Sequence, residues 1–243
     1  MSDPSGTVDA MTDRPHDQLR PVTLELGFTE STPGSVLISM GRTRVLCTAS
    51  LASDVPRWMR DSGKGWVTAE YAMLPGSSGS RIRRDHVSGG RAKEISRLIG
   101  RSLRAGVDMK VMGEAMVRVD CDVIEADGGT RTAAITGAWV ALHQALEDAV
   151  ERGVIPRNPI IDEVAAISVG IVDGEPCLDL DYVKDVSAEV DMNVVMSGRG
   201  LFVEVQGTAE RAPFSRGELD RLLDLAAAGI EELHDMQRRA VAD

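Results

Sequence analysis

The sequence is poor in aromatic residues, histidine and cysteine. Aromatic side chains make up 3% of 243 residues, which argues against a base-stacking platform such as an RNA-recognition motif. The four histidines are scattered and form neither an HExxH motif nor a triad-like cluster, so a histidine-centred hydrolase is not expected. The three cysteines, Cys47, Cys121 and Cys177, stand apart in the sequence. Their spacing excludes a CxxC zinc or redox site and is typical of a reducing cytoplasm.

Long hydrophobic runs and the common nucleotide-binding motifs are also missing. No uncharged apolar run approaches 18 residues, so we expect no membrane span, and the first residues carry neither a basic nor an apolar signal region. There is no GxGxxG after a strand and no GxxxxGK[ST], which argues against a dinucleotide site and a P-loop. Residues 76–80 approach a nucleophile elbow, but Ser80 stands where glycine is required. We therefore expect a cytoplasmic globular protein with another kind of site.

Charge is distributed unevenly along the chain, whose formal net charge is −11. Residues 76–104 carry eight basic and two acidic side chains, whereas residues 105–243 carry 12 basic and 27 acidic ones. Two interpretations of the basic segment stay open. It is either a local contact surface for phosphate or nucleic acid, or a solvated helix face with salt bridges.

The pattern of hydrophobic residues predicts a mixed α+β fold. Residues 1–15 are small, polar and proline-containing and indicate a flexible tail, and residues 16–243 are expected to form a single domain. We expect strands at 22–26, 35–40, 45–49, 66–73, 117–124, 165–172, 177–182, 190–196 and 201–206, and helices over 91–103, 132–151 and from about 215. In this order each half resembles a few antiparallel strands covered by helices.

A glycine pair between a predicted strand and a predicted helix is the first candidate site. The segment reads Asp127-Gly128-Gly129-Thr130-Arg131-Thr132. Glycines allow close approach of a ligand to the backbone, and a helix N-terminus offers unpaired N–H groups to an anion such as phosphate. A plain turn with Asp127 or Thr130 as the helix cap explains the same residues.

An acidic series in the second half is the second candidate site, formed by Asp179, Asp181, Asp185, Glu189 and Asp191. Asp185 and Asp191 are six residues apart, so they would face the same way on one continuous strand, unless a loop intervenes. Two such carboxylates can hold Mg²⁺ together with waters, or share a proton for general acid catalysis. Solvated charges at strand edges are the other interpretation. With the glycine segment and the arginines, the pair suggests chemistry on phosphodiesters, with inorganic phosphate or a nucleotide as partner.

Long blocks that include these residues resemble the ribonuclease PH family of phosphate-dependent 3′-exoribonucleases. The resemblance extends from about Asp17 to the C-terminal part of the chain. Its blocks include residues 17–22 (DQLRPV), 45–50 (VLCTAS), 65–71 (GWVTAEY), 97–101 (RLIGR), 120–132 (DCDVIEADGGTRT), 191–196 (DMNVVM) and 204–210 (EVQGTAE). It implies the ribonuclease PH domain, which is related to domain 2 of ribosomal protein S5, with mixed sheets covered by helices.

The resemblance also implies an activity and an assembly. The activity is 3′-to-5′ phosphorolysis of RNA, also called tRNA nucleotidyltransferase. It trims the 3′ ends of tRNA precursors and of rRNA, releases nucleoside diphosphates and runs in reverse as nucleotide addition. The assembly is a homohexamer, a trimer of dimers. One alternative is a non-catalytic RNA-binding subunit of an exosome-like ring, and another is hydrolysis by water.

Finally, the resemblance assigns roles to residues of this sequence. The attacking phosphate is held by Arg91, Gly129, Thr130 and Arg131. The catalytic acid and the Mg²⁺ ligands come from Asp185 and Asp191. The RNA path is lined by Arg81, Arg83 and Arg84.

Overall fold

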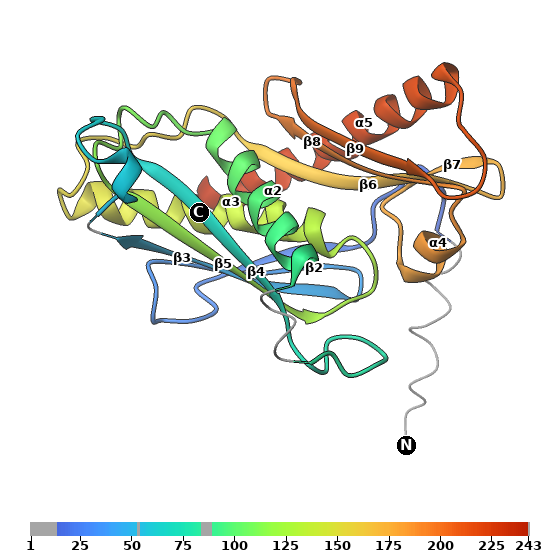
Figure 1. The fold of residues 1–243 in the computed structure, drawn as a ribbon, viewed down its shortest axis with the longest axis horizontal. Coiled ribbons are helices and arrows are strands. Elements are labelled where there is room, and N and C mark those ends of the chain that lie inside the picture. Colours follow the sequence, from blue (N-terminus) through green and yellow to red (C-terminus); the bar gives the residue numbers. More distant parts are fainter. Residues whose placement is uncertain (1–13, 53, 84–88, 243) are drawn as a thin grey trace.

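The computed structural model describes residues 14–52, 54–83 and 89–242, which form two β-sheets and their covering helices (Figure 1). Most of the expected N-terminal tail, residues 1–13, lies outside the described residues, as does Arg84. Arg14, near the end of the expected tail, is already part of the fold because its guanidinium donates to the carbonyls of Leu178 and Asp179. The expected α+β class is confirmed.

The first sheet has five strands in the order β1-β2-β3-β5-β4. They are β1 (Val22–Leu26), β2 (Gly34–Met40), β3 (Thr43–Ala52), β4 (Trp66–Met73) and β5 (Met116–Glu125). β4 and β5 run parallel, so the expectation of only antiparallel strands is wrong here. The strands are parallel because helix α2 (Gly90–Ala105) connects them in the sequence and returns the chain to the end of the sheet at which β4 began.

The second sheet has four antiparallel strands in the order β7-β6-β8-β9. They are β6 (Val164–Val172), β7 (Glu175–Leu178), β8 (Val190–Ser197) and β9 (Phe202–Ala209). The strand expected over 177–182 is wrong beyond Leu178. Asp179 adopts a left-handed φ of 54° and its carboxylate pairs with Arg20, after which Asp181 caps the short helix α4 (Tyr182–Ser187).

Helix α3 (Thr130–Glu151) lies between the two sheets and is buried on almost every side. It packs on β2 and β3 of the first sheet and on β6 of the second. Helix α5 (Arg216–Ala242) covers β6 and β7. One continuous hydrophobic core runs through both sheets and the helices between them. The two halves therefore hold the N-terminus of α3 rigidly beside the second sheet.

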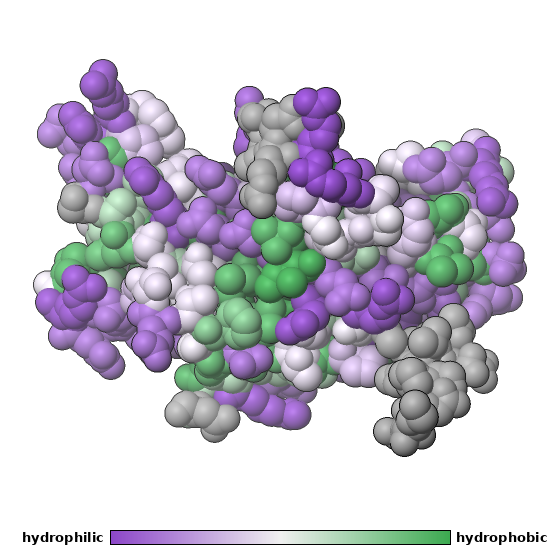
Figure 2. All heavy atoms as spheres, turned by 90° about the horizontal axis from the view of Figure 1, so that it is seen from below, coloured by the Kyte–Doolittle hydropathy of each residue, from purple (hydrophilic) through white to green (hydrophobic). Residues whose placement is uncertain are grey.

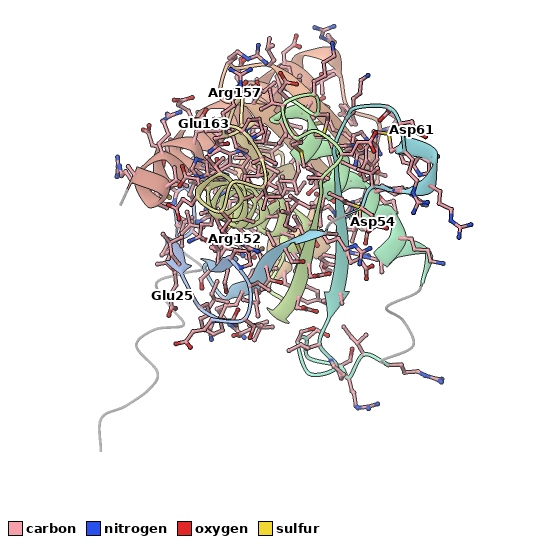
Figure 3. All side chains as sticks on the ribbon, turned by 90° about the vertical axis from the view of Figure 1, so that its left-hand side faces the viewer. Glu25, Asp54, Asp61, Arg152, Arg157 and Glu163 are labelled. Atoms are coloured by element: carbon pink, nitrogen blue, oxygen red, sulfur yellow. The ribbon has the colours of Figure 1, made fainter. Side chains whose placement is uncertain are left out.

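The surface of the first sheet that faces away from α2 and α3 contains an apolar patch bordered by hydrophilic residues (Figure 2). At the end of the molecule remote from α4, charges of both signs are mixed, and Asp54, Asp61, Arg152 and Arg157 lie on the face shown in Figure 3. Within the described ranges, no helix is long and apolar enough to cross a membrane. The three cysteines are free and buried, and Cys47 and Cys121, far apart in the sequence, face each other across β3 and β5.

Candidate active site

The N-terminus of α3 is built to receive a group from outside the helix. Gly129, its N-cap, has a left-handed φ of 66°, which costs glycine little. Among the described residues no side chain caps this helix end, and its first turn contains no acidic residue. The first backbone N–H groups of a helix have no partner within the helix and attract anions. The interpretation in which Asp127 or Thr130 caps the helix is therefore wrong, and the anion site at this helix end stays a prediction.

Two arginines flank this helix end. Arg131 lies in the first turn of α3, and Arg91 lies in the first turn of α2. The Nη1 of Arg131 donates to Oε1 of Gln206 at 2.8 Å and lies 3.7 Å from Oε1 of Glu94, and Gln206 donates to Glu94 in turn. Elements from both halves of the chain thus hold the Arg131 guanidinium in one orientation.

The two candidate carboxylates lie on different elements. Asp185 is on α4 and Asp191 is on β8, so the single strand considered above is wrong and a loop does intervene. Burial, followed by the charge of Asp185, raises the pKa of the Asp191 carboxyl from 3.8 to about 6. Burial also raises the pKa of Asp185, which Arg91 and Arg131 oppose. The charge of Asp185 therefore acts on Asp191, and the two partly buried carboxylates are not independent, solvated charges.

One cavity of about 660 Å³ brings these groups together. Its lining contains all six residues expected to bind phosphate or to act on it: Arg91, Gly129, Thr130, Arg131, Asp185 and Asp191. Asn193, two residues after Asp191 on β8, also lines the cavity. Ser78 and Ser80, from the segment after β4, line it too. Two cations, two carboxylates and a helix N-terminus around one space can hold an anion beside an acid.

The arginines expected along the RNA path have a mixed outcome. Arg81 and Arg83 line a second hollow of about 580 Å³ at the start of α2, together with Arg91. Arg84 lies outside the described residues. The basic segment thus adjoins the cavity at residues 78–80 and at the first turn of α2, while further along that helix Arg101 pairs with Glu204. The salt-bridged helix face therefore applies at Arg101, and the contact surface for phosphate or nucleic acid stays a prediction for the part that contains Arg81, Arg83 and Arg91.

The sequence interpretation missed the residues that orient the site. Tyr71, 4% exposed, has its hydroxyl 2.8 Å from Oγ1 of Thr130, and Gln206 holds Arg131. Glu94 completes that contact from α2. Tyr71 and Gln206 lie within the family-like blocks, and Tyr71 has a polar tip at an inward-facing strand position. Nothing in the spacing shows which partner each one finds.

The two carboxylates also suit a divalent cation. Within the described ranges, no three His, Cys, Asp or Glu side chains form a cluster that could hold a metal ion. Mg²⁺ does not require such a cluster, because it commonly binds one or two carboxylates and takes its other ligands from waters and substrate phosphates. The charge of Asp185 raises the pKa of Asp191, and a cation between the two carboxylates would offset that repulsion. The donor set therefore fits Mg²⁺.

Models of a known enzyme family match both halves of the chain. Residues 18–146 match the model described as "3′ exoribonuclease family, domain 1", and residues 162–229 match "3′ exoribonuclease family, domain 2". The curated protein "Ribonuclease PH" of Corynebacterium efficiens is 56% identical over 231 residues, which is 94% of each chain. The one of Corynebacterium glutamicum is 54% identical with the same coverage.

Solved structures show the same fold at low sequence identity. A chain of the Archaeoglobus fulgidus exosome with RNA bound to its active site aligns with a TM-score of 0.80 at 19% identity, over 93% of this chain and 91% of that one. Rice Rrp46 aligns with a TM-score of 0.77 at 18% identity, over 96% of this chain and 100% of that one. With both family models and the close curated relatives, these matches show that the chain belongs to the ribonuclease PH family of 3′ exoribonucleases.

Proposed function

We propose that this protein removes nucleotides from RNA 3′ ends by phosphorolysis and that the cavity at the N-terminus of α3 is its active site. Inorganic phosphate is the attacking group, and the products are a nucleoside diphosphate and an RNA one nucleotide shorter. The observation that carries the proposal is that the cavity of about 660 Å³ is lined by Arg91, Arg131 and the uncapped helix end together with Asp185 and Asp191. tRNA precursors are the proposed main substrates, and rRNA 3′ ends are a second class.

Phosphate binding is the first task of the site. A phosphate dianion approaching an RNA phosphodiester is repelled by it, and fixed positive groups offset that repulsion. Arg91, Arg131 and the N–H groups after Gly129 would supply them, and Thr130, held by Tyr71, adds a hydroxyl donor. Because Gln206 and Glu94 orient Arg131 beforehand, little reorganisation is needed when phosphate binds.

The chemical step is an in-line displacement. An oxygen of the bound phosphate forms a bond to the phosphorus of the last phosphodiester, and the bond from that phosphorus to the 3′-oxygen of the preceding nucleotide breaks. The departing 3′-oxygen needs a proton. Asp191, with a pKa raised to about 6 by burial and by Asp185, is suited to hold a proton near neutral pH and to give it up.

Binding of Mg²⁺ is the other role that Asp185 and Asp191 could have. When bound, the ion supplies charge neutralisation for the scissile phosphate. Proton donation and cation binding compete for the Asp191 carboxylate, because a metal ligand must be deprotonated. A Mg²⁺ titration of an Asp191 variant separates the two, and its result is argued in the Discussion.

The RNA strand would reach the cavity past the segment between β4 and α2. Arg81 and Arg83 line the hollow that adjoins Arg91, and Arg84 follows them in the sequence. Cationic side chains along such a path attract the RNA backbone without reading its sequence. We therefore assign these arginines to RNA binding and not to the chemical step.

The decisive experiment compares reactions with and without phosphate. A 3′-labelled RNA incubated with the protein and phosphate should release a nucleoside diphosphate, and the reaction without phosphate should release nothing. Excess nucleoside diphosphate should extend the same RNA, because the exchanged bonds are close in free energy. Release of a nucleoside monophosphate independent of phosphate would identify hydrolysis and reject the proposal.

A non-catalytic RNA-binding ring subunit is the alternative. Such a subunit has no need of a phosphate pocket with a carboxylate pair, and its arginines or aspartates can be lost without penalty. Here Arg91, Arg131, Asp185 and Asp191 are all present and line the same cavity. This observation favours the enzyme.

Assembly into a homohexamer, a trimer of dimers, is a further prediction. The apolar patch in Figure 2 is bordered by polar residues, and over the molecule as a whole the exposed apolar side chains include Phe28, Leu74 and Phe202. Such patches commonly mark protein–protein contacts. A ring would also combine the basic segments of several acidic subunits around one RNA. Light scattering at micromolar concentration should give six times the 26.1 kDa chain mass, and a monomer at moderate salt would contradict this.

We also place the protein in the cytoplasm. All three of its cysteines are free thiols, which suits a reducing compartment.

A further inference from the structure

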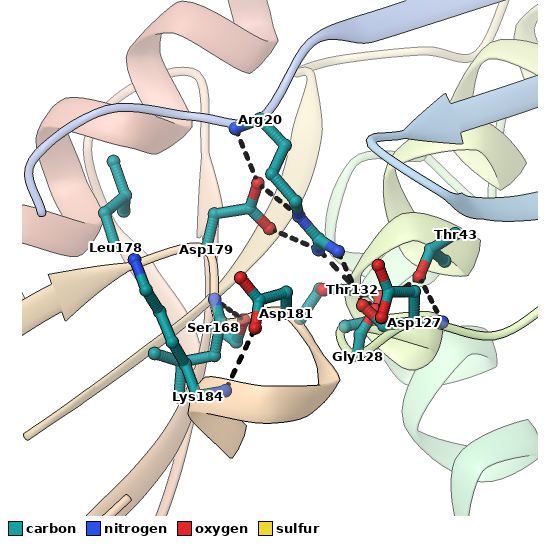
Figure 4. A network of polar contacts seen from close by, with 12 residues as sticks. Arg20, Thr43, Asp127, Gly128, Thr132, Ser168, Leu178, Asp179, Asp181 and Lys184 are labelled. Atoms are coloured by element: carbon teal, nitrogen blue, oxygen red, sulfur yellow. Dashed lines mark hydrogen bonds and ion pairs between the residues drawn. The ribbon is translucent and has the colours of Figure 1, made fainter. Parts of the chain in front are cut away.

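A buried arginine outside the cavity connects the two parts of the site. Arg20 follows β-turn residues near the start of the described chain, and its side chain is 1% exposed. Its backbone N–H and its Nε both donate to Oδ2 of Asp179, at 2.9 and 3.0 Å, and its Nη2 donates to Oδ1 at 2.7 Å (Figure 4). Arg20 lies far in the sequence from Asp179, and neither residue lines the cavity of about 660 Å³.

The same guanidinium also forms hydrogen bonds with the loop before α3. Its Nη1 donates to the carbonyl of Asp127 at 2.6 Å, and its Nη2 approaches the carbonyl of Gly128 at 3.5 Å. The hydroxyl of Thr43 donates to the Gly128 carbonyl at 2.6 Å and accepts the Asp127 N–H at 2.9 Å. In a trans peptide the N–H points opposite to the carbonyl. With these carbonyls turned inward, the N–H groups of Gly128 and Gly129 point away from Arg20, and both residues line the cavity.

On its other side, Asp179 fixes the segment that carries Asp185. The Asp179 N–H donates to the carbonyl of Ser168 at 2.7 Å, and the next N–H, of Leu180, donates to the Ser168 hydroxyl at 3.0 Å. Asp181 then caps α4 by accepting the N–H of Lys184, and its carbonyl accepts the N–H of Asp185. Each bond lies within a few residues of the next, so a shift of Asp179 moves the start of α4.

The phosphate loop and the α4 segment touch directly at Gly128. A Cβ atom at Gly128 would lie 2.5 Å from the Leu180 carbonyl oxygen and 2.6 Å from the Asp181 carbonyl carbon. Both neighbours are backbone atoms, which cannot move aside as a flexible side chain does. The two segments are therefore in backbone contact, and the Arg20–Asp179 pair spans this contact from the buried side.

We propose that Arg20 and Asp179 are positioning residues that hold the phosphate-binding loop and the helix bearing Asp185 in a fixed relation. Neither touches the substrate. Their effect is transmitted through the carbonyls of Asp127 and Gly128 on one side and through Asp181 on the other. This inference rests on the proposed phosphorolytic function. Because small displacements of groups around a reacting centre are costly, loosening the pair affects both phosphate binding and turnover.

Conservative variants test the pair. Arg20→Lys keeps the charge but loses the planar fork that reaches a carboxylate and two carbonyls at once. Asp179→Asn keeps the shape but replaces an acceptor by a donor that faces Arg20. Controls come from a second ion pair that joins two segments of the second sheet, Arg199 with Asp162, at the opposite end of β8 from Asp191, in which Asp162 is 4% exposed and Arg199 is 64% exposed. The controls are Arg199→Lys and Asp162→Asn.

The measurement is the initial rate of phosphorolysis against phosphate concentration, with thermal unfolding of each variant recorded alongside. Arg20→Lys and Asp179→Asn should each raise KM for phosphate by about tenfold to a hundredfold and lower kcat. The kcat/KM of the double variant should lie within about twofold of that of the less active single variant, because the two residues act as a unit. Both controls should leave KM and kcat within about twofold of the wild type even where they lower Tm.

The outcomes are distinguishable from failure of the function itself. A wild-type protein without phosphate-dependent product rejects the proposed function. An active wild type whose Arg20→Lys and Asp179→Asn variants lose Tm as the controls do, with KM and kcat unchanged, makes the pair purely structural. If neither variant folds while both controls fold, the pair is a folding requirement and the positioning role is likewise rejected.

Discussion

Asp191→Asn should lower phosphorolysis by about a hundredfold to ten-thousandfold, the range typical for loss of a general acid or base. The substitution keeps the shape of the side chain and removes one charge. Extension of RNA by nucleoside diphosphate should fall by the same factor, because forward and reverse reactions pass through one transition state. Phosphate binding measured by calorimetry should survive or strengthen, since Arg91 and Arg131 remain and the nearby negative charge decreases.

A Mg²⁺ titration under single-turnover conditions distinguishes the two roles of Asp191. If Asp191 is a metal ligand, excess Mg²⁺ should restore part of the activity. If it is the acid, no Mg²⁺ concentration should do so. Glu189→Gln is the matched control, because it removes the same charge from a residue just before β8 whose carboxylate accepts the N–H of Gly174. Near-normal turnover of Asp191→Asn at every Mg²⁺ level would exclude this carboxylate from the site.

The same variant should be more stable than the wild type at neutral pH. The pKa of Asp191 is raised in the folded state from 3.8 to about 6, so the folded protein binds this proton more tightly than the unfolded chain does. The wild type therefore loses stability as pH rises from about 4 to about 6, and the loss persists above that range. Asn has no such loss. Tm of the variant should exceed that of the wild type by more at pH 8 than at pH 5.

Local signals in the sequence were enough to predict most of the fold. The alternating residues of β4 predict the same bounds as observed, 66–73, and the turn at Gly41-Arg42 predicts the hairpin of β2 and β3. The strand predicted to continue through Tyr182 failed because Asp179 and Asp181 alternate with apolar residues, as strand residues do. Its end is decided by Arg20, a partner so distant in the sequence that no local pattern contains it.

The candidate site likewise contains some residues that local sequence signals predict and others that depend on distant partners. The glycine segment predicted a phosphate site because the loop and the helix N-terminus are adjacent in the sequence. Arg91 was expected only through the family resemblance, since α2 reaches the cavity by the parallel crossover between β4 and β5. The six-residue spacing of Asp185 and Asp191 indicated two carboxylates that do line one cavity, but they lie on α4 and β8 and not on one strand. Tyr71 and Gln206 find their partners only in the folded chain.

Arg131→Ala should weaken phosphate binding by about tenfold to a hundredfold, because a hydrogen bond to a charged group contributes roughly 1.5–3 kcal/mol. Arg131 lies in the first turn of α3, where alanine is a good helix former, so the fold should persist. Its loss leaves Gln206 and Glu94 without the guanidinium that they hold. Rates measured against phosphate concentration should show the effect mainly in KM, and calorimetry should show the same factor in Kd.

Arg101→Ala is the matched control for this loss of charge. Arg101 lies on α2 and pairs with Glu204 of β9 at 3.0 Å, so it also joins that helix to the second sheet, but it does not line the cavity. Its variant should bind phosphate as the wild type does. Arg131→Lys, which keeps the charge and loses the fork, should fall between the wild type and Arg131→Ala if the contact is bidentate. Unchanged phosphate saturation in Arg131→Ala would move the phosphate site away from α3, whereas equal losses in the Arg131 and Arg101 variants would reduce the contact to a general effect of positive charge.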